Sequence, residues 1–457
     1  MKIYNTQTKT KEEFKPLDYP NVKIFVCGPT VYDKPHIGHA RVYVVFDSFV
    51  KFLKHLGYKV FYIQNITDID DKIINKANKE GVSFKEIAIR YEKEYFEAVK
   101  KLRIDSVDKY CRATEHMQEI ISQVKRLLEK GFAYETDDGI YFDISKFKEY
   151  GKLSGRKEVK EEDAVSRIDE SVKKRNKGDF ALWKFSKEGE PFWESEFGKG
   201  RPGWHIEDTA ITEKYFGPQY DIHGGGIDLI FPHHEAELTQ MEALSGKSPF
   251  VKYWMHLGFL KIRGEKMSKS LGNFITIEDF IEKHGARVLR YFMLKSHYRS
   301  PIDFTEDLVF QAKKEIEKLD DFRARLEKVD GNVGGVSLNV KEVENNFVQS
   351  LEDDFNTPKA FGVLFDFVNE VNSLMDKGLL SKELSDKVLD FLNNIDTFLG
   401  FIYWEEEIPQ EIIELVQKRE ELRRKGEWGE ADKIREEIQR RGYTIKDTEK
   451  GPIVRKN

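Results

Sequence analysis

Apolar runs and amphipathic stretches alternate through the first third of the chain. Two strand-like apolar runs, at residues 22–27 and 59–66, flank a stretch at 40–55 whose apolar positions have the spacing of a helix. Strands that alternate with helices in this way form a parallel sheet with helices on its faces. We therefore predict an α/β fold whose first part is one half of a Rossmann-type, nucleotide-binding sheet.

Helical patterns follow between residues 83 and 130. Ser83 and Glu86 form a capping box that predicts a helix to about residue 102, and a second amphipathic run covers residues 115–130. We expect these helices to belong to a subdomain, at about 80–200, inserted into the sheet. Residues 152–177 are rich in alternating charges and poor in apolar side chains, as in a solvated connection.

Long amphipathic helices replace this pattern from about residue 304. Thr357 and Pro358 predict the N-cap and first turn of one such helix, and the tail after residue 409 holds two helical segments around Trp428 and a strand-like end. We predict three domains. They are an α/β domain at 1–303 that includes the insertion, a helical bundle at 304–400, and a small α+β domain at 401–457.

Composition describes an ordinary globular protein. Charged residues make up 34% of the chain and hydrophobic residues 39%, and no apolar run reaches the length of a membrane span. Two cysteines are too few for a disulfide framework, and the N-terminus lacks a targeting pattern, so we expect a cytoplasmic protein with no membrane partner. A net charge of −6 argues against a globally basic nucleic-acid coat but leaves local basic surfaces open.

Two short motifs, about 230 residues apart, have chemistry suited to a polyphosphate. The sequence HIGH at 36–39 lies between a strand and a helix, where imidazoles and backbone N–H groups gather anionic oxygens and Gly38 permits close approach. The sequence KMSKS at 266–270 supplies two ammonium groups on a glycine-flanked loop that can close on a leaving pyrophosphate. We expect these side chains to stabilise phosphate charge rather than to act as nucleophiles.

These motifs resemble the two signatures of the class I aminoacyl-tRNA synthetases. Four further segments are similar to the cysteinyl-tRNA synthetases within that class: FVCGPTVYD at 25–33, NITDIDDK at 65–72, GRPGWHIE at 200–207 and DIHGGGIDLIFPHHE at 221–235. The resemblance implies ATP-dependent activation of L-cysteine to cysteinyl-adenylate with release of pyrophosphate, followed by transfer to the 3′-terminal ribose of tRNA(Cys). It also implies Mg²⁺ with ATP and a monomer. For the later parts of the chain it implies a tRNA stem-contact region at about 260–303, a DALR-type tRNA-binding helical domain, and a C-terminal anticodon-recognition domain.

The resemblance further assigns roles to individual residues. The expected ATP-binding residues are His36, Gly38, His39, Gly225, Gly226, Asp228, Lys266, Ser268 and Lys269, of which His36, His39, Lys266 and Lys269 are the catalytic group. The expected substrate-binding residues are Thr67, Asp68, Trp204, His205 and His223, and the expected tRNA-binding residues are Trp428, Asp432, Arg435 and Asp447. On sequence grounds alone a glycine run is more often a turn and a tryptophan more often a core residue.

A zinc site is the third expectation. His233 and Glu237 are four residues apart in a helix-like segment and share one face, a spacing that fits zinc ligation as well as a surface His/Glu pair. The family holds one zinc per chain with two cysteines, a histidine and a glutamate, and the substrate thiolate becomes an additional ligand. The matching positions here are Cys27, Asp208, His233 and Glu237.

The chain departs from the family at Asp208, where a cysteine is usual. A carboxylate oxygen is a legitimate zinc ligand, so the four side chains can still close a tetrahedron around a more electrophilic metal. The alternative is that Asp208 points away and water fills the position. Cys111 is expected to be a buried or incidental thiol rather than a substitute ligand.

Two other functions compete with this interpretation. A cysteine ligase that joins activated cysteine to a small amine would have little use for the helical and basic C-terminal regions. A catalytically silent tRNA-binding relative would not need both intact motifs. Direct ligation of a thiolate also selects cysteine over serine at binding, which agrees with the absence of sequence for a large editing domain between the motifs.

Overall fold

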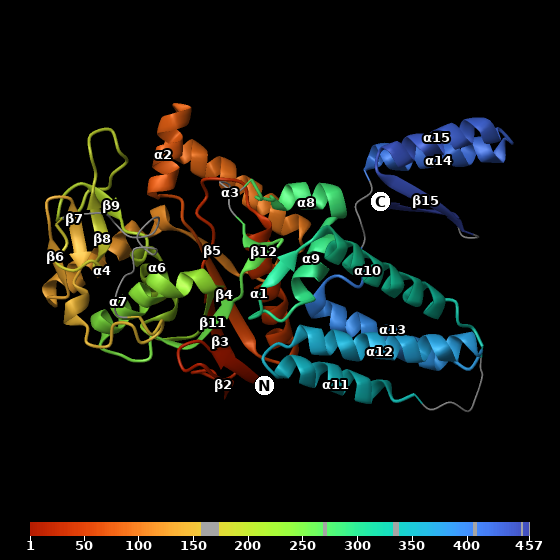
Figure 1. Ribbon diagram of the computed structural model, residues 1–457, viewed down its shortest axis with the longest axis horizontal. Helices are drawn as coiled ribbons and strands as arrows, with labels where there is room; N and C mark the ends of the chain where they lie inside the picture. The colour runs from red at the N-terminus through yellow and green to blue at the C-terminus, as the bar shows by residue number, and fades with distance from the viewer. Residues whose placement is uncertain (157–172, 268–271, 332–337, 405–408, 449–450, 457) are drawn as a thin grey trace.

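The computed structural model describes residues 1–156, 173–267, 272–331, 338–404, 409–448 and 451–456. A five-stranded parallel sheet in the order β11-β10-β3-β4-β5 lies at the centre of the first domain (Figure 1). Its strands are β3 (Asn21–Val26), β4 (Lys59–Ile66), β5 (Lys109–Arg112), β10 (Tyr220–Gly226) and β11 (Val251–Leu257). The first domain is therefore the predicted α/β domain.

The strand order reverses between β3 and β10. From β3 the chain proceeds to β4 and β5 on one side, whereas β10 and β11 lie on the other side, and Gly224 pairs with Val26 across the boundary. In open parallel sheets, ligands bind beyond the carboxyl ends of the strands at such a switch point. Residues just after Val26 and Gly226 are therefore placed at the expected binding crevice.

Helix α1 (Ile37–His55) begins three residues before the predicted start. His36 is its N-cap, and its side chain accepts a hydrogen bond from the backbone N–H of Gly38. In most helices this acceptor is the side chain of Ser, Thr, Asp or Asn. The remaining helices of this domain are α2 (Asp71–Glu80), α3 (Phe84–Lys101), α4 (Met117–Glu129), α6 (Ile206–Phe216), α7 (Glu235–Ser245), α8 (Ile277–His284) and α9 (Ala286–Leu294). The predicted capping box of Ser83 and Glu86 opens α3.

The inserted unit is a four-stranded antiparallel sheet, and it begins later than the predicted residue 80. Strand β5 pairs with β4, so α3 and β5 belong to the parallel sheet. The insertion contains α4 and the strands β6 (Ala133–Glu135), β7 (Gly139–Phe142), β8 (Phe180–Phe185) and β9 (Gly200–Pro202). A four-residue strand with the sequence KYCR carries too little apolar periodicity to be recognised. Most of the predicted charged connection lies outside the described residues.

Two small sheets complete the first domain. The hairpin of β1 (Lys2–Asn5) and β2 (Thr10–Glu13) packs beside β11. The second sheet has β12 (Leu260–Ile262) between β13 (Glu265–Lys266) and β14 (Ile302–Phe304). Strand β13 therefore carries the chain into the predicted lysine loop.

The helical bundle contains α10 (Glu306–Leu326), α11 (Val340–Glu352), α12 (Thr357–Asp376) and α13 (Lys382–Leu399). The N-cap of α12 is Asn356 rather than the predicted Thr357, because the Asn356 side chain accepts from the backbone of Lys359. Thr357 instead donates its hydroxyl to the carbonyl of Leu294 at 2.6 Å and ties the bundle to α9. Within the described residues, no helix is long and apolar enough to cross a membrane.

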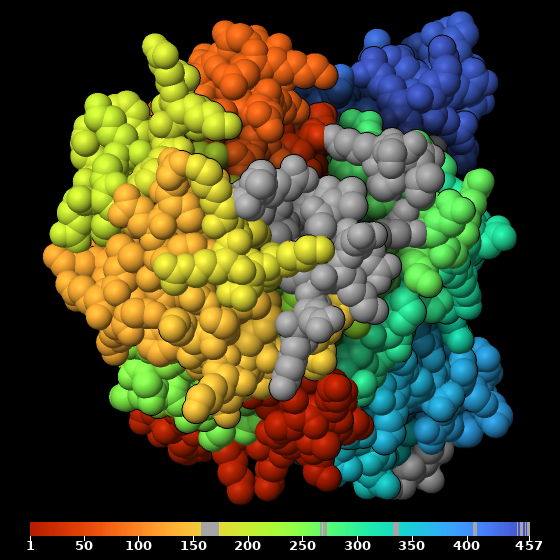
Figure 2. All heavy atoms as spheres, turned by 60° about the vertical axis from the view of Figure 1, so that its left-hand side comes forward, coloured from red at the N-terminus to blue at the C-terminus, as the bar shows by residue number. Residues whose placement is uncertain are grey.

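The C-terminal module is a separate small unit (Figure 1). Helices α14 (Gln410–Arg424) and α15 (Trp428–Arg440) pack on the hairpin of β15 (Tyr443–Thr448) and β16 (Gly451–Lys456) around their own apolar cluster. Figure 2 shows the inserted sheet, in orange and yellow, and the helical bundle, in green to light blue, on opposite sides of one face, with the dark blue module above.

A buried ion pair inside the first domain also anchors the bundle, because Arg290 reaches a carbonyl of α13. Asp47 of α1 and Arg290 of α9 are 2.6 Å apart with both side chains fully buried, and the Asp47 carboxylate also accepts the backbone N–H groups of Asp105 and Ser106. Arg290 donates further to the carbonyls of Leu102 and Leu399. Burial raises the pKa of Asp47, but Arg290 and Lys51 outweigh it and hold that pKa below its usual range.

Replacing Arg290 with methionine should destabilise the chain by about 3–5 kcal/mol, because Asp47 would remain buried without its main counter-charge. Urea unfolding at pH 7 would measure the change, with the exposed Arg90→Met on α3 as a control that should leave stability nearly unchanged. Equal stability of Arg290→Met and the parent chain would contradict a structural role for this pair.

Candidate active site and metal centre

A cleft of about 820 Å³ opens at the switch point of the parallel sheet. Of the residues selected from the sequence, Cys27, His36, Gly38, His39, Trp204, His205, Gly226 and Asp228 line it. Gly225 faces inward instead, where a Cβ atom would lie 2.9 Å from a ring carbon of His234. Its lack of a side chain is therefore explained by packing on His234.

Two imidazoles at the start of α1 form a fixed pair on the cleft wall. Nδ1 of His36 accepts the N–H of Gly38 at 3.1 Å, and Nδ1 of His39 accepts the N–H of His36 at 3.3 Å. The rings stack with centroids 3.7 Å apart. Because both Nδ1 atoms are acceptors, each neutral ring carries its proton on Nε2 and is a hydrogen-bond donor there.

Burial keeps this pair neutral. Desolvation lowers the pKa of His36 to about 4, although the nearby Asp228 carboxylate raises it in part. The pKa of His39 is well below its usual value, chiefly from burial and then from the charge of His36. At neutral pH the pair therefore offers N–H donors to an anionic ligand without carrying positive charge.

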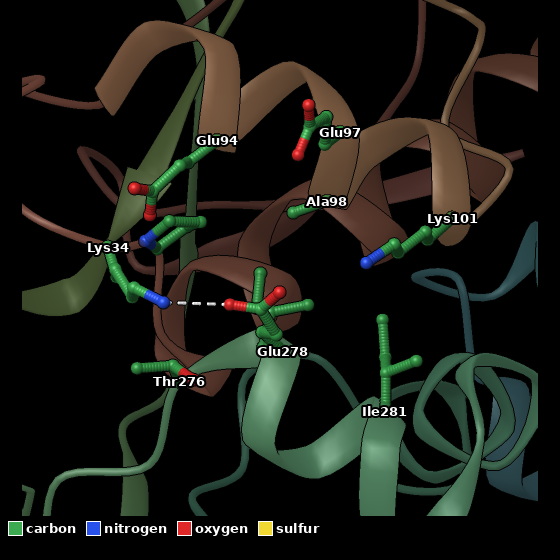
Figure 3. A pocket seen from close by; sticks show the side chains of 10 residues that line it. Lys34, Glu94, Glu97, Ala98, Lys101, Thr276, Glu278 and Ile281 are labelled. Carbon is green, nitrogen blue, oxygen red and sulfur yellow. Dashed lines mark hydrogen bonds and ion pairs between the residues drawn. The ribbon is translucent and has the colours of Figure 1, made fainter. Parts of the chain in front are cut away.

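The segment that follows the lysine loop, residues 275–277, is hydrogen-bonded through its backbone to the imidazole turn. The N–H of Ile37 donates to the carbonyl of Ile275 at 3.1 Å, and the N–H of Ile277 donates to the carbonyl of Pro35 at 2.9 Å. Figure 3 shows Lys34 and Glu278, 2.8 Å apart, beside a small pocket between α3 and α8. The predicted Ser268 and Lys269 lie outside the described residues, and Lys266 is placed by its backbone in β13.

The four predicted metal ligands come together behind the cleft. Ligand atoms of Cys27, Asp208, His233 and Glu237 all lie within 4.8 Å of one another. Asp208 Oδ2 is 3.5 Å from Cys27 Sγ and 3.1 Å from His233 Nε2, and Glu237 Oε1 is 3.0 Å from His233 Nε2. Asp208 thus points into the cluster rather than away from it.

These residues come from four separate elements. Cys27 directly follows β3, and Asp208 is in the first turn of α6. His233 is in a short π-helical turn, Ile230–His234, and Glu237 follows in α7, so the predicted shared face spans a junction between two helical segments.

The electrostatics of the cluster call for a cation. Burial is the main cause that raises the pKa of Asp208 to about 8 and the pKa values of Glu237 and Cys27 well above their usual ranges, and mutual repulsion adds to the shifts of the last two. Asp208 Oδ1 and both Glu237 carboxylate oxygens are buried without a hydrogen-bond partner. One sulfur, one imidazole and two carboxylates are a donor set that fits a divalent transition metal.

Aromatic rings orient His233 toward this centre. Trp204 stacks on its ring with centroids 4.1 Å apart, and Nδ1 of His205 lies 2.7 Å from Nδ1 of His233. A histidine that ligates a metal through one nitrogen commonly has its other nitrogen held by a neighbouring group. Trp204 and His205, predicted as substrate contacts, therefore also support the ligand.

A second pair of histidines surrounds Cys27; sequence reasoning missed His234 and selected His223 only as a substrate contact, although His223 is not among the described residues that line the cleft. Nε2 of His234 is 3.0 Å and Nε2 of His223 is 3.4 Å from Cys27 Sγ, and with Glu237 these residues form an overlapping candidate donor set. On the other side of each ring, Nδ1 of His234 lies 2.7 Å from Nε2 of His256, and Nδ1 of His223 lies 2.6 Å from the Tyr220 hydroxyl. The doublet HH at 233–234 and the cluster of five histidines between 205 and 256 were the available signal.

Thr67 and Asp68 make contacts different from those expected. The Thr67 hydroxyl donates to Glu207, and the Asp68 carboxylate accepts the backbone N–H of Thr114 at 3.0 Å. Neither is among the described residues that line the cleft. Glu207 is a buried carboxylate that was not selected from the sequence, although it directly precedes Asp208.

One face of α15 is exposed and carries three of the predicted RNA contacts. Trp428, Asp432 and Arg435 have helical spacing, and 60% of Trp428 is exposed, whereas Ala431, Ile434 and Ile438 face the module's core. The fourth residue, Asp447, is paired with Arg419 through two contacts of 2.8 and 2.9 Å, which lower the pKa of Asp447 to about 2. Asp447 therefore also stabilises the module, by joining β15 to α14 through Arg419.

Known families match nearly the whole chain. Residues 13–314 match the tRNA synthetases class I (C) catalytic domain, residues 346–403 the DALR domain, and residues 405–455 the cysteinyl-tRNA ligase anticodon binding domain. A cysteine–tRNA ligase of Caldicellulosiruptor saccharolyticus is 46% identical over 99% of both chains. One of Thermococcus onnurineus is 45% identical over 99% of this chain and 98% of the relative.

Solved structures share the fold at low sequence identity. Methionyl-tRNA synthetase of Mycobacterium tuberculosis, in complex with methionyl-adenylate, superposes with a TM-score of 0.60 and 16% identity, over 84% of this chain and 88% of that one. A putative arginyl-tRNA synthetase of Campylobacter jejuni gives a TM-score of 0.57 and 16% identity, over 84% and 92% of the two chains.

The imidazole pair generates a test that needs no ligand. We expect His36 and His39 to be neutral Nε2–H tautomers at pH 6, with His36 titrating near pH 4. The unfolded chain protonates these rings near pH 6.5, so their contribution to stability falls as the pH decreases from about 6.5 toward 4. Long-range ¹H–¹⁵N NMR of ¹⁵N-histidine protein would show this, and a pKa near 6.5 or an Nδ1–H tautomer would contradict the geometry.

Proposed function

Because the chain belongs to the family of class I cysteine–tRNA ligases, we propose that its cleft activates L-cysteine with ATP and transfers the cysteine to tRNA(Cys). The observation that carries the proposal is the convergence, at one switch point, of the neutral imidazole pair and the buried Cys27 cluster. The first suits a triphosphate and the second a thiol. Cysteine-dependent pyrophosphate exchange followed by tRNA charging tests both halves.

In the first reaction, the cysteine carboxylate attacks the α-phosphorus of ATP and the bond to the bridging oxygen of pyrophosphate breaks. His36 and His39 donate their Nε2–H groups to phosphate oxygens as charge develops, and Lys266 and Lys269 neutralise the departing pyrophosphate. Mg²⁺ bound with ATP would supply further neutralisation of the phosphates. Gly226 and Asp228 border the cleft where the ribose hydroxyls bind.

In the second reaction, a terminal ribose hydroxyl of the tRNA attacks the carbonyl carbon of the mixed anhydride. AMP leaves, and the ester bond that forms carries cysteine on the tRNA. No covalent bond to the enzyme is needed in either step. The helical bundle and the C-terminal module hold the RNA, which favours tRNA as the acceptor over a small amine.

Cys27, Asp208, His233 and Glu237 would hold a single zinc ion. When bound, the zinc supplies a Lewis acid that binds the substrate's thiolate and so distinguishes cysteine from serine. Trp204 and His205 hold the His233 ring in place, and the Nε2 atoms of His223 and His234 lie 3.4 and 3.0 Å from the Cys27 sulfur. A protonated Nε2 at this distance would donate to a Cys27 thiolate and favour its deprotonated form.

We further propose a cytoplasmic monomer. Both cysteines are free and buried, in keeping with a reducing compartment. The alternative of a catalytically silent tRNA-binding relative is disfavoured by the intact geometry of His36 and His39. Cysteine-dependent pyrophosphate exchange would be absent from such a relative, and transfer to tRNA would be absent from an amine ligase.

The oxygen ligand Asp208 generates a graded prediction. Asp208→Ala should lose metal and cysteine activation together, Asp208→Asn should retain an intermediate amount of metal, and Asp208→Cys should remain metal-bound and active, because a thiolate restores a strong donor. Metal content by mass spectrometry and pyrophosphate exchange would be measured in parallel.

Glu213→Ala is the matched control, since this carboxylate is on the same helix but pairs with Arg126 and should leave the metal in place. Full metal occupancy and normal cysteine-over-serine selection in Asp208→Ala would show that only three side chains ligate the metal.

The exposed face of α15 generates a second prediction. Trp428→Ala and Arg435→Ala should each lower kcat/KM for tRNA charging about tenfold, because a stacking ring or a charge contact to RNA is lost, and should leave pyrophosphate exchange unchanged. Lys433→Ala removes an equal charge from another face of the same helix and is the control. Equal losses in Arg435→Ala and Lys433→Ala would mean that this face has no specific role.

A further inference from the structure

Helix α3 ends on a residue with unusual backbone geometry. Arg103 has φ 53°, and the bonds from Arg103 N to Lys100 O and from Ile104 N to Val99 O close the helix around it. The same paired bonds end α1, α4, α12 and α14 with glycine in the equivalent place, at Gly57, Gly131, Gly378 and Gly426. A side chain in this left-handed position is strained, so its presence calls for a compensating role.

The Arg103 side chain reaches the end of the helical bundle. Its guanidinium donates to the carbonyl of Tyr403 at 2.9 Å and lies 4.0 Å above the Trp404 ring. A planar guanidinium can stack on a ring and donate in its own plane at once, which a lysine ammonium cannot do. The Arg103 carbonyl separately accepts Lys51 and Arg290, and those contacts do not depend on the side chain.

Residues 401–404 are held first by the bundle and then by the first domain. Asp396 accepts the backbone N–H groups of Phe401, Ile402 and Tyr403. Arg287 of α9 donates to the carbonyls of Phe401 and Ile402. Arg103 then holds the last two residues, Tyr403 and Trp404.

Trp404 is also the last described residue before the C-terminal module. Only residues 405–408 separate it from Pro409, the residue before α14. Five residue steps span at most about 18 Å, so the position of Trp404 restricts where the module can be placed.

We propose that Arg103 is a positioning residue for tRNA charging. By stacking on Trp404 it sets the point and direction at which the chain leaves the catalytic unit. The exposed face of α15 is thereby presented to the same RNA whose acceptor end enters the cleft. This inference rests on the proposed function, because it concerns two contacts with a single tRNA.

Full-length tRNA(Cys) and an acceptor-stem minihelix separate positioning from catalysis. Arg103→Gly and Trp404→Leu should each lower kcat/KM about tenfold for the full-length tRNA, with minihelix charging and pyrophosphate exchange within twofold of the parent chain. Arg103→Gly should keep or raise Tm, because glycine relieves the left-handed strain. The double variant should be no worse than either single variant, since both remove one contact. Arg90→Ala, an exposed arginine on α3, is the control.

A second measurement covers the case in which minihelix charging is too slow to compare. Pulsed electron paramagnetic resonance would measure the distance between spin labels at position 318 on α10 and position 433 on α15. The distance distribution should be broader in Arg103→Gly than in Arg90→Ala, because the exit of the chain at Trp404 is no longer fixed.

Three results would overturn the proposal. They are unchanged charging of full-length tRNA, an unchanged distance distribution, or an equal loss on both RNAs with a lower Tm, which would make Arg103 a structural clamp only. A parent chain that charges neither RNA would instead refute the proposed function on which the inference rests.

Discussion

The burial of three acidic side chains in one cluster, the Cys27 thiol and two carboxylates, is the constraint on which the site depends. Cys27, Asp208 and Glu237 lie in the interior, and within the described residues the ion-pair partners of the two carboxylates are imidazoles. Without a cation they can be accommodated only by holding protons, as their raised pKa values indicate. A divalent metal at the proposed site would replace those protons. The rings of Trp204 and His205 contact His233, which is the arrangement expected around a metal-ligating imidazole.

One strand end serves both halves of the chemistry. Cys27 follows β3 directly, and His36, nine residues later, caps the helix that returns along the sheet. The Cys27 cluster and the imidazole pair are thus both attached to the segment between β3 and α1. The backbone bonds between the imidazole turn and residues 275–277 connect the lysine loop to that element as well.

Much of this could be predicted from the sequence, and the exceptions have physical causes. The parallel sheet, α1, the capping box of α3 and the C-terminal hairpin follow from periodicity and cap chemistry, which are local. The four members of the proposed metal site were selected by matching to a family, and the structure brings them together. Strand β5 was missed because pairing with β4, not its own sequence, makes it a strand. The contacts of Thr67 and of His234 depend on residues far away in the chain, which spacing cannot reveal.

X-ray absorption at the metal edge of the purified protein tests the central claim most directly. The account predicts zinc with one sulfur at about 2.3 Å, one imidazole nitrogen, and two carboxylate oxygens at about 2.0–2.2 Å, since Asp208 takes the place of a second thiolate. Two imidazoles in the spectrum would contradict it, because they would place the metal among Cys27, His223, His234 and Glu237. Protein that binds no metal at all would contradict it more completely, and would leave the buried acids to be explained by protonation alone.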